Sequence, residues 1–400
     1  MRVLLGMQGT VDFVIDWRPV EIERVAREFR ITAVELDSPA AITGERSLFV
    51  ALLQHFAEGR GGERFVPSSD VVKDLAKRFR TEVTLGGTCV RAALLLRSLG
   101  VPSLLHLVSE DAHSRRLLPD DCAYITSATE DTLDPHLIVQ YAQGDSVTID
   151  GRRLTAPSAN RVIIANDPPA SMLRLSPRLA EEVARADLFL VSGFNTIQDP
   201  RVLQERLAQM QEVLAQRAEG STVVYEDAGF HDPQYAPVVS HALGPLVDVL
   251  SMNEDELQVR IGREIDLRDV GQVARAIAEL REMIPDPTLV VHTRFWSVAV
   301  GDRAEEFAGA VDMGNASAGA RFLRGDGITA DDIREVADGA RQTEIVPLAR
   351  DLEDQLGSGA RCLAAFDVRP RVPTTIGLGD TFVGGFLAEI ALRASAEAAA

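Results

Sequence analysis

Short apolar runs alternate with amphipathic stretches of helical spacing from about Glu181 onward. The expected strands cover residues 188–191, 223–225, 247–252 and 289–291. Helices are expected between them, for example near 200–218 and 270–283. This alternation predicts a parallel sheet covered by helices on both faces. Right-handed crossovers would bring the C-terminal ends of the strands to one edge, where open α/β sheets bind ligands.

Two stretches depart from this alternation, residues 13–45 and 103–160, which carry short polar and apolar alternations separated by turns. Such patterns are typical of antiparallel strands joined by tight turns. We therefore expect an α/β fold, a mostly parallel sheet flanked by helices, with a smaller α+β lid domain. The core is expected to contain residues 1–12, 46–102 and 161–400, and the lid the two departing stretches.

The composition is that of an ordinary globular chain, with 46% hydrophobic and 25% charged residues among 400. The formal net charge of -19 argues against a nucleic-acid partner, because phosphate backbones are bound by surplus Lys and Arg. No apolar run approaches a membrane span or a signal peptide. Three widely spaced cysteines fit a reducing compartment. We expect a cytoplasmic protein that binds small molecules rather than nucleic acids or membranes.

A glycine-rich turn, Gly377-Leu378-Gly379-Asp380, opens directly into an expected helix. The two glycines permit close approach of a ligand to the backbone. Their N–H groups, together with the helix dipole, suit a phosphate. Asp380 at the helix entrance could accept the proton of an attacking hydroxyl. The alternative is a turn in which Asp380 only caps the helix, the commoner role for such a turn by itself.

Further polar residues follow the expected strands. Glu226 comes directly after the strand at 223–225, and Asn253 and Glu256 begin a helix after the strand at 247–252. The carboxylates could meet a hydrated Mg²⁺, which needs only one or two of them. The Asn-x-x-Glu spacing is also that of a helix capping box, and Glu226 could lie in a solvated turn. Convergence on one sheet edge favours a phosphate-binding site.

Other residues suggest a small polar ligand. Gly86 and Gly87 join an expected strand to a helix and would let a polyol press against the backbone, although a merely tight connection is equally expected. Asp12, at the end of the first strand region, could accept two sugar hydroxyls. His292 follows the strand at 289–291 and should reach the same crevice, although a single His is more often structural.

The Gly377–Thr381 turn together with Asn253-x-x-Glu256 resembles the ribokinase (phosphofructokinase-B) superfamily. Within it, the chain resembles the ADP-dependent glucokinase/phosphofructokinase family, since it carries GLGD where ATP-dependent members more often carry GAGD. The segments at 58–63, 160–163, 192–195 and 291–294 also resemble segments of that family. The resemblance is discontinuous over most of the chain and implies a ribokinase-like fold.

The resemblance implies a role for each candidate residue. Asp380 would deprotonate the sugar hydroxyl, the amides from Gly377 to Asp380 would form an anion hole, and Arg161 would contact the transferred phosphate. The residues implied for Mg²⁺ are Glu226, Glu256 and Asp380. The residues implied for ADP, the phosphoryl donor, are Asn253, His292, Val372 and Gly379. The residues implied for the sugar are Asp12, Glu63, Gly86, Gly87 and His136.

The chain departs from the family pattern near the metal and sugar positions. Val224 stands where a His often precedes the first metal Glu, Gln140 stands where a Glu often follows the lid His, and no Asn precedes Asp12. The sugar therefore stays open. Glucose is the first expectation, because Glu63 suits a neutral hydroxyl-bearing sugar. Fructose 6-phosphate is the second, its phosphate being met by Arg152, Arg153 or Arg294.

Two further functions stay open. One is an ATP-dependent ribokinase-type kinase for a sugar or nucleoside, and the other is a catalytically silent protein that binds sugar or nucleotide. Asp380 with both glycines argues against silence. The GxSxG, HExxH, Walker and first-turn GxGxxG motifs are missing, which argues against hydrolases, P-loop kinases and Rossmann dehydrogenases. The sequence does not determine an oligomeric state.

Overall fold

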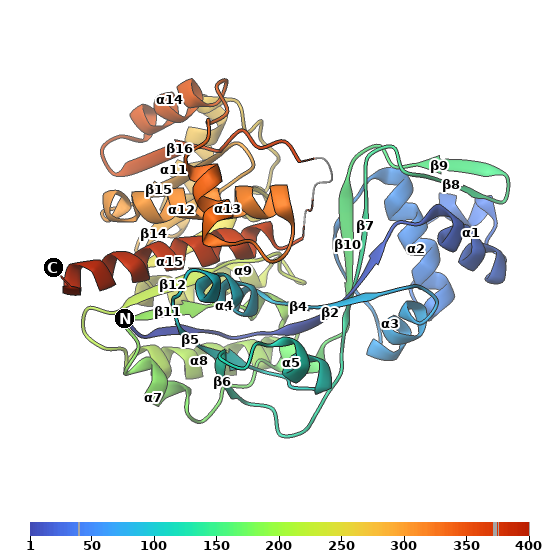
Figure 1. The fold of residues 1–400 in the computed structure, drawn as a ribbon, viewed down its shortest axis with the longest axis horizontal. Helices are drawn as coiled ribbons and strands as arrows, with labels where there is room; N and C mark the ends of the chain where they lie inside the picture. Colours follow the sequence, from blue (N-terminus) through green and yellow to red (C-terminus); the bar gives the residue numbers. More distant parts are fainter. Residues whose placement is uncertain (39–40, 371–373, 375, 400) are drawn as a thin grey trace.

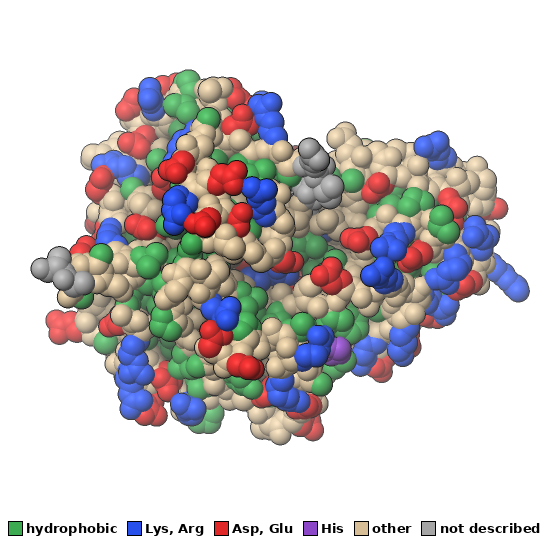
Figure 2. Space-filling view, viewed as in Figure 1, with side chains coloured by type: hydrophobic (Ala, Val, Ile, Leu, Met, Phe, Trp, Pro, Cys, Tyr) green, Lys and Arg blue, Asp and Glu red, His purple; other side chains and the backbone are tan. Residues whose placement is uncertain are grey.

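The computed structural model describes residues 1–38, 41–370, 374 and 376–399, arranged in two lobes (Figure 1). The larger lobe contains a nine-stranded sheet and the smaller lobe a five-stranded sheet. A hairpin of β8 (Ser146–Ile149) and β9 (Arg152–Thr155) lies at the far end of the smaller lobe. The surface is hollowed between the two lobes, and basic and acidic side chains are interspersed on the face seen in Figure 2.

The nine-stranded sheet has the order β16-β15-β14-β13-β12-β11-β1-β5-β6. It is parallel from β14 to β6, whereas β15 and β16 run antiparallel to their neighbours. Its strands are β1 (Val3–Leu5), β5 (Ser103–Leu107), β6 (Ala123–Thr126), β11 (Leu188–Val191), β12 (Thr222–Glu226), β13 (Val249–Asn253), β14 (Thr288–His292), β15 (Trp296–Val300) and β16 (Ala360–Ala364). The four strands expected after Glu181 are confirmed as β11 to β14.

Both faces of this sheet are buried, which explains why its strands read as continuous apolar runs. Successive residues point to opposite faces. Leu4 lies in one hydrophobic cluster, while its neighbours Val3 and Leu5 lie in the other. Phe189 is separated from Leu188 and Leu190 in the same way. The parallel sheet is therefore the central layer between two helical layers, as the alternation predicted.

The helices divide between these two layers. The first cluster is covered by α7 (Leu179–Val183), α8 (Pro200–Leu214), α9 (Tyr235–Leu243), α10 (Glu254–Arg260), α11 (Val270–Met283) and α14 (Val346–Leu356). The second is covered by α4 (Thr88–Ser98), α12 (Ala304–Arg324) and α15 (Leu378–Ala399), with α13 (Ala330–Ala337) packed on α12. Short helical turns are α5 (Ala112–Leu117), α6 (Pro168–Met172), η1 (Ala33–Asp37), η2 (Phe194–Thr196) and η3 (Gly244–Leu246).

The smaller lobe is a mixed sheet of order β3-β10-β7-β2-β4, packed on helices of its own. Its strands are β2 (Thr10–Asp16), β3 (Gly62–Phe65), β4 (Glu82–Gly86), β7 (His136–Tyr141) and β10 (Asn160–Ala165). Its helices are α1 (Pro19–Glu28), α2 (Glu45–Glu58) and α3 (Ser69–Ala76). The apolar residues of these strands and helices form a separate core that includes Phe49, Phe56 and Leu137.

The expected lobe boundaries need correction. Residues 46–86 were assigned to the core, but α2, β3, α3 and β4 belong to the smaller lobe. Residues 103–126 were assigned to the lid, but β5 and β6 extend the large sheet. The strands of the smaller sheet come from two stretches of the chain, residues 10–86 and 136–165. Local periodicity does not reveal which of these distant strands pair.

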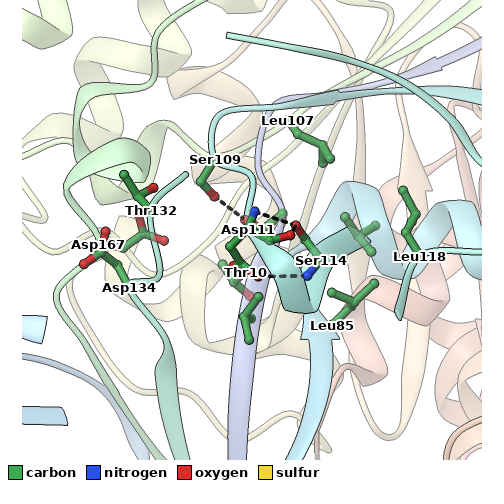
Figure 3. Close-up of a pocket in the computed structure, with 13 residues that line it drawn as sticks. Thr10, Leu85, Leu107, Ser109, Asp111, Ser114, Leu118, Thr132, Asp134 and Asp167 are labelled. Atoms are coloured by element: carbon green, nitrogen blue, oxygen red, sulfur yellow. Dashed lines mark hydrogen bonds between the residues drawn. The ribbon is translucent and has the colours of Figure 1, made fainter. Parts of the chain in front are cut away.

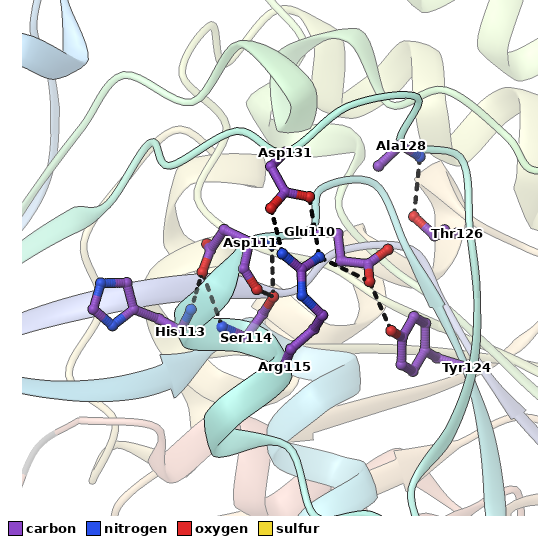
Figure 4. A network of polar contacts seen from close by, with 9 residues as sticks. All are labelled: Glu110, Asp111, His113, Ser114, Arg115, Tyr124, Thr126, Ala128 and Asp131. Atoms are coloured by element: carbon purple, nitrogen blue, oxygen red, sulfur yellow. Dashed lines mark hydrogen bonds and ion pairs between the residues drawn. The ribbon is translucent and has the colours of Figure 1, made fainter.

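A polar network fixes the segment that leads into β7 (Figure 4). Arg115 of α5 pairs with Glu110 and Asp131, and the Tyr124 hydroxyl donates to Glu110 at 2.8 Å. The backbone N–H of Thr132 donates to the Glu110 carbonyl at 3.1 Å. These contacts hold the connection that enters the smaller lobe at His136. Among the described residues, no helix is long and apolar enough to cross a membrane.

Candidate active site

Three candidate residues end neighbouring strands at one edge of the large sheet. Glu226, Asn253 and His292 are the last residues of β12, β13 and β14, and Asn253 lies directly opposite His292 in the register. The Nε2 atom of His292 is 3.4 Å from Oε1 of Glu226. The convergence expected from parallel strands is therefore present, and it brings together residues that are far apart in the sequence.

Asp380 lies in the first turn of α15, which packs against α4 and α12. The Thr88 hydroxyl donates to Oδ1 of Asp380 at 2.9 Å, and Nε of Arg91 lies 3.5 Å from Oδ2. These described contacts are to side chains of another helix rather than to backbone N–H groups of α15. They favour a positioned, partly exposed carboxylate over the capping role considered for Asp380.

The turn before α15 requires glycine at its first position. Gly377 has φ +67°, in the left-handed region, and a Cβ there would lie 2.9 Å from Cδ of Arg91. The Gly377 carbonyl accepts from the backbone N–H of Thr381 at 3.0 Å, so the turn leads straight into the helix. At Gly379, a Cβ would only contact the His292 ring at 3.5 Å. Val372 lies outside the described residues.

Most residues predicted for the sugar meet on the smaller sheet. Asp12 pairs in register with His136, and it accepts from the Thr10 hydroxyl at 2.7 Å. A Cβ on Gly86 would lie 2.2 Å from Oδ2 of Asp12, so only glycine fits beside that carboxylate. Gly87 has φ +85°, where the chain turns into α4. Gly86 thus makes the contact with Asp12, and Gly87 makes the tight connection into α4.

His136 is surrounded by carboxylates. Its Nε2 atom lies 3.4 Å from Oδ2 of Asp167. Burial lowers the pKa of His136, but Asp167, Glu63 and Asp12 outweigh it and raise the pKa to about 9. Glu63 also approaches the large lobe, with its Oε1 atom 3.8 Å from Nε2 of His231. The region predicted to bind the sugar, called the sugar side below, is therefore rich in hydrogen-bond acceptors.

A small pocket borders this side (Figure 3). Thr10 and Leu85 line it from the smaller sheet, and Asp111, Asp134 and Asp167 contribute carboxylates from the surrounding loops. Asp111 also caps the N-terminus of α5, because its carboxylate accepts from the backbone N–H of Ser114 at 3.0 Å. The pocket extends the acceptor-rich surface beyond His136.

Arg161, predicted to contact the transferred phosphate, is on β10 and half-buried. Burial lowers the pKa of Arg161, and the nearby carboxylates of Asp380 and Asp255 only partly offset this. Arg91 lies close enough to oppose its charge as well. A half-buried cation near the candidate base has the location that an anionic ligand would require.

Glu226 and Glu256 are crowded carboxylates. The Oε2 atom of Glu226 has no hydrogen-bond partner among the described residues. Burial raises the pKa of both groups, and for Glu256 the charges of Asp227 and Glu226 raise it further. A cation between them would relieve both burial and repulsion, so these residues fit a hydrated Mg²⁺. Within the described chain, no group of three or more His, Cys, Asp or Glu could hold a metal by itself.

The capping box considered for Asn253 and Glu256 is also present. Oδ1 of Asn253 accepts from the N–H groups of Asp255 and Glu256 at 2.7 and 3.2 Å. Oε2 of Glu256 accepts from the N–H of Asn253 at 2.8 Å. Only the other carboxylate oxygen of Glu256 is left for a ligand, so capping and cation binding are compatible roles.

Several residues at the site were not found from the sequence. Arg91 and Arg321 are buried on α4 and α12, and Nε of Arg321 donates to the Ile376 carbonyl at 2.7 Å. Asp227 forms a buried ion pair with Arg260 at 2.6 Å, which holds the end of β12. His292 stacks on Phe382 of α15, with ring centroids 4.3 Å apart. The available signal was an arginine on an otherwise apolar or small-residue helix face.

The family model described as the ADP-specific phosphofructokinase/glucokinase conserved region matches residues 1–387. The chain belongs to this family. It is a phosphotransferase of the ADP-dependent sugar kinases, which act on a sugar hydroxyl. No curated protein matches the chain.

Solved structures share the fold at low identity. A phosphofructokinase from Pyrococcus horikoshii OT3 with AMP is 15% identical, with a TM-score of 0.79 and 98% of each chain covered. An ADP-dependent kinase in complex with fructose 6-phosphate and ADPβS is 14% identical, with a TM-score of 0.76 and coverage of 98% of this chain and 93% of that one. An Anopheles gambiae adenosine kinase is 16% identical, with a TM-score of 0.53 and coverage of 98% and 90%. The ribokinase-like fold is confirmed.

Proposed function

We propose that this protein transfers a phosphoryl group from Mg-ADP to a hydroxyl of a hexose, with glucose as the first candidate, giving AMP and a sugar phosphate. One observation carries the proposal. The carboxylate of Asp380 is held by Thr88 and Arg91, and the same Arg91 also binds Asp12 on the sugar side. A base next to a hydroxyl-binding carboxylate, at the start of a helix that follows Gly377, supports transfer to an alcohol.

The transfer requires little covalent chemistry from the protein. Asp380 accepts the proton of the attacking hydroxyl, while the amides from Gly377 to Gly379 and the guanidinium of Arg161 stabilise the phosphate in the transition state. Most of the acceleration comes from alignment and charge neutralisation. Glu226 and Glu256 would hold Mg²⁺, which neutralises charge on the phosphates when bound. Closure of the smaller lobe over the sugar would exclude water and limit hydrolysis of ADP.

The sugar side favours a neutral substrate over a phosphorylated one. Asp12, Glu63 and Asp167 outnumber the protonated His136 that they surround, so a phosphate here would meet a net like charge. Two arginines considered for a sugar phosphate are used elsewhere: Arg152 pairs with Asp37 at 2.6 Å and Arg153 donates to Ser146 at 3.0 Å, both on the outer hairpin. Fructose 6-phosphate is the second candidate, supported by its presence in one related structure.

A kinase assay that crosses ADP and ATP with glucose, fructose 6-phosphate, ribose and nucleosides tests the proposal. We expect AMP and glucose phosphate from ADP and glucose, with fructose 6-phosphate a poorer acceptor. Turnover with ATP but not with ADP would overturn the donor. Turnover only with fructose 6-phosphate would overturn the first sugar. Binding of sugar and nucleotide without turnover would support the silent binding protein instead.

Glu226→Gln and Glu256→Gln should each raise the Mg²⁺ concentration needed for half-maximal rate by about 10-fold or more, because a carboxylate next to the ion orients it and its waters. Glu182→Gln is the matched control, since Glu182 is also buried but pairs with Arg178 at 3.1 Å outside the site. Magnesium titration of the rate measures the effect. An unchanged requirement in both site variants would leave only the capping role for Glu256.

A further inference from the structure

Arg91 is a buried cation at the site, and neither the expected mechanism nor the family resemblance assigns it a role. It lies on the first turns of α4, directly after Gly86 and Gly87, and its side chain is 6% exposed. Burying a guanidinium is costly unless carboxylates and hydrogen bonds compensate it. The groups that compensate the buried charge of Arg91 are therefore expected to lie around it.

Three carboxylates surround this guanidinium. Nη2 lies 3.1 Å from Oδ2 of Asp12, Nε lies 3.5 Å from Oδ2 of Asp380, and Nη1 lies 3.6 Å from Oδ1 of Asp326. Burial alone would lower the pKa of Arg91, but these carboxylates together raise it. Asp12 comes from β2 of the smaller sheet and Asp380 from α15 of the larger lobe. One side chain thus connects the two lobes across the site.

The two inner carboxylates are held in the same manner. Asp12 accepts from the Thr10 hydroxyl at 2.7 Å through Oδ1 and from Arg91 through Oδ2. Asp380 accepts from the Thr88 hydroxyl at 2.9 Å through Oδ1 and faces Arg91 through Oδ2. Each carboxylate therefore has one oxygen on a threonine and the other on the shared guanidinium. Their separation is set by the rigid planar fork of Arg91.

Two glycines leave the space that Arg91 and Asp12 occupy. A Cβ at Gly377 would lie 2.9 Å from Cδ of Arg91, and a Cβ at Gly86 would lie 2.2 Å from the Asp12 oxygen that Arg91 contacts. Arg321 holds the other side of the turn through the Ile376 carbonyl, and it pairs with Asp326 at 2.6 Å. The anion-hole turn, the sugar-side carboxylate and the base are thus packed around the same side chain.

We infer that Arg91 is a positioning residue that fixes the sugar-side carboxylate Asp12 relative to the base Asp380. This inference rests on the proposed function, since it concerns the alignment of the acceptor hydroxyl with its base. A hydroxyl bound by Asp12 then meets Asp380 in a fixed geometry. Arg91 does not touch the substrate in this role.

Kinetics of Arg91→Gln and Arg91→Lys test the inference. For Arg91→Gln we expect kcat to fall about 100-fold, the cost of a misplacement of about 1 Å, with an increase in KM for the sugar and little change in KM for ADP. Arg91→Lys should restore little, because an ammonium cannot bridge two carboxylates as a planar fork does. Added guanidinium ion should restore part of the rate to an Arg91→Ala variant.

Arg206→Gln is the matched control. Arg206 is equally buried on α8 and donates to the Met172 carbonyl at 2.9 Å, away from the site. It should lower the melting temperature without changing kcat. If Arg91→Gln keeps a wild-type kcat, or loses rate only in proportion to folded protein and without guanidinium rescue, the positioning role is overturned while the proposed function stands. If the wild type itself turns over no sugar with ADP, both fall together.

Discussion

Asp380→Asn is expected to lower kcat by about 100- to 10,000-fold, the range that a general base contributes. The amide keeps the size of the carboxylate and can still accept from Thr88, so folding should be preserved. KM for the sugar should change little, because the loss is confined to proton transfer in the transition state. Steady-state rates with ADP and glucose, together with thermal melting, measure both effects.

Asp326→Asn is the control for this variant. Asp326 also lies near Arg91, but its side chain is 66% exposed. Its replacement should leave kcat within a few-fold of the wild type. If the Asp380→Asn protein turns over at the wild-type rate, Asp380 is not the base. An unfolded Asp380→Asn protein would show that the carboxylate is required for stability, and Asp380→Glu would then test the chemical role.

Arg161→Gln is expected to lower kcat by about 100- to 1,000-fold, as does the loss of a donor to developing charge in other enzymes. Its effect on stability should have the opposite sign. Burial lowers the pKa of Arg161, which means that the charged form is held against a desolvation cost. A neutral glutamine removes this cost, so the melting temperature should be unchanged or higher.

A fall in kcat without a fall in melting temperature would distinguish a charge needed for function from one needed for stability. Arg152→Gln is the comparison, because Arg152 belongs to the same lobe but pairs with Asp37 on the outer hairpin. It should affect neither rate nor melting. A loss of stability in Arg161→Gln with an unchanged kcat would contradict the assignment of Arg161 to the transferred phosphate.

Much of the site could be predicted because it depends on strand ends. Parallel strands bring their C-terminal residues to one edge, so Glu226, Asn253 and His292 had to converge once the strands were located. The turn at Gly377 was equally visible, since glycines before a helix mark a local conformation. For Asn253 and Glu256 the sequence could not separate capping from cation binding, and the structure contains the cap together with an environment that suits a cation.

For other parts of the site, the local sequence does not identify the contacts that the residues make. Arg91 stands among apolar residues of its helix, which indicates burial, but nothing near it in the sequence indicates that it is buried against Asp12 and Asp380. Arg321 follows a run of small residues on α12 that also allows close helix packing. In both cases the partners come from segments far away in the sequence. Local periodicity and motif spacing contain no information on such contacts.

The sequence by itself determined the class of fold, the glycine turn with its aspartate, and the strand-end carboxylates, because these follow from local periodicity and backbone sterics. Only the tertiary structure decided which strands form the smaller lobe and which arginines lie between the carboxylates. Strands β2, β3, β4, β7 and β10 pair across long chain separations, and the shared core of Phe49, Phe56 and Leu137 assembles only when they do. Burial of distant groups against one another is a property of the folded chain alone.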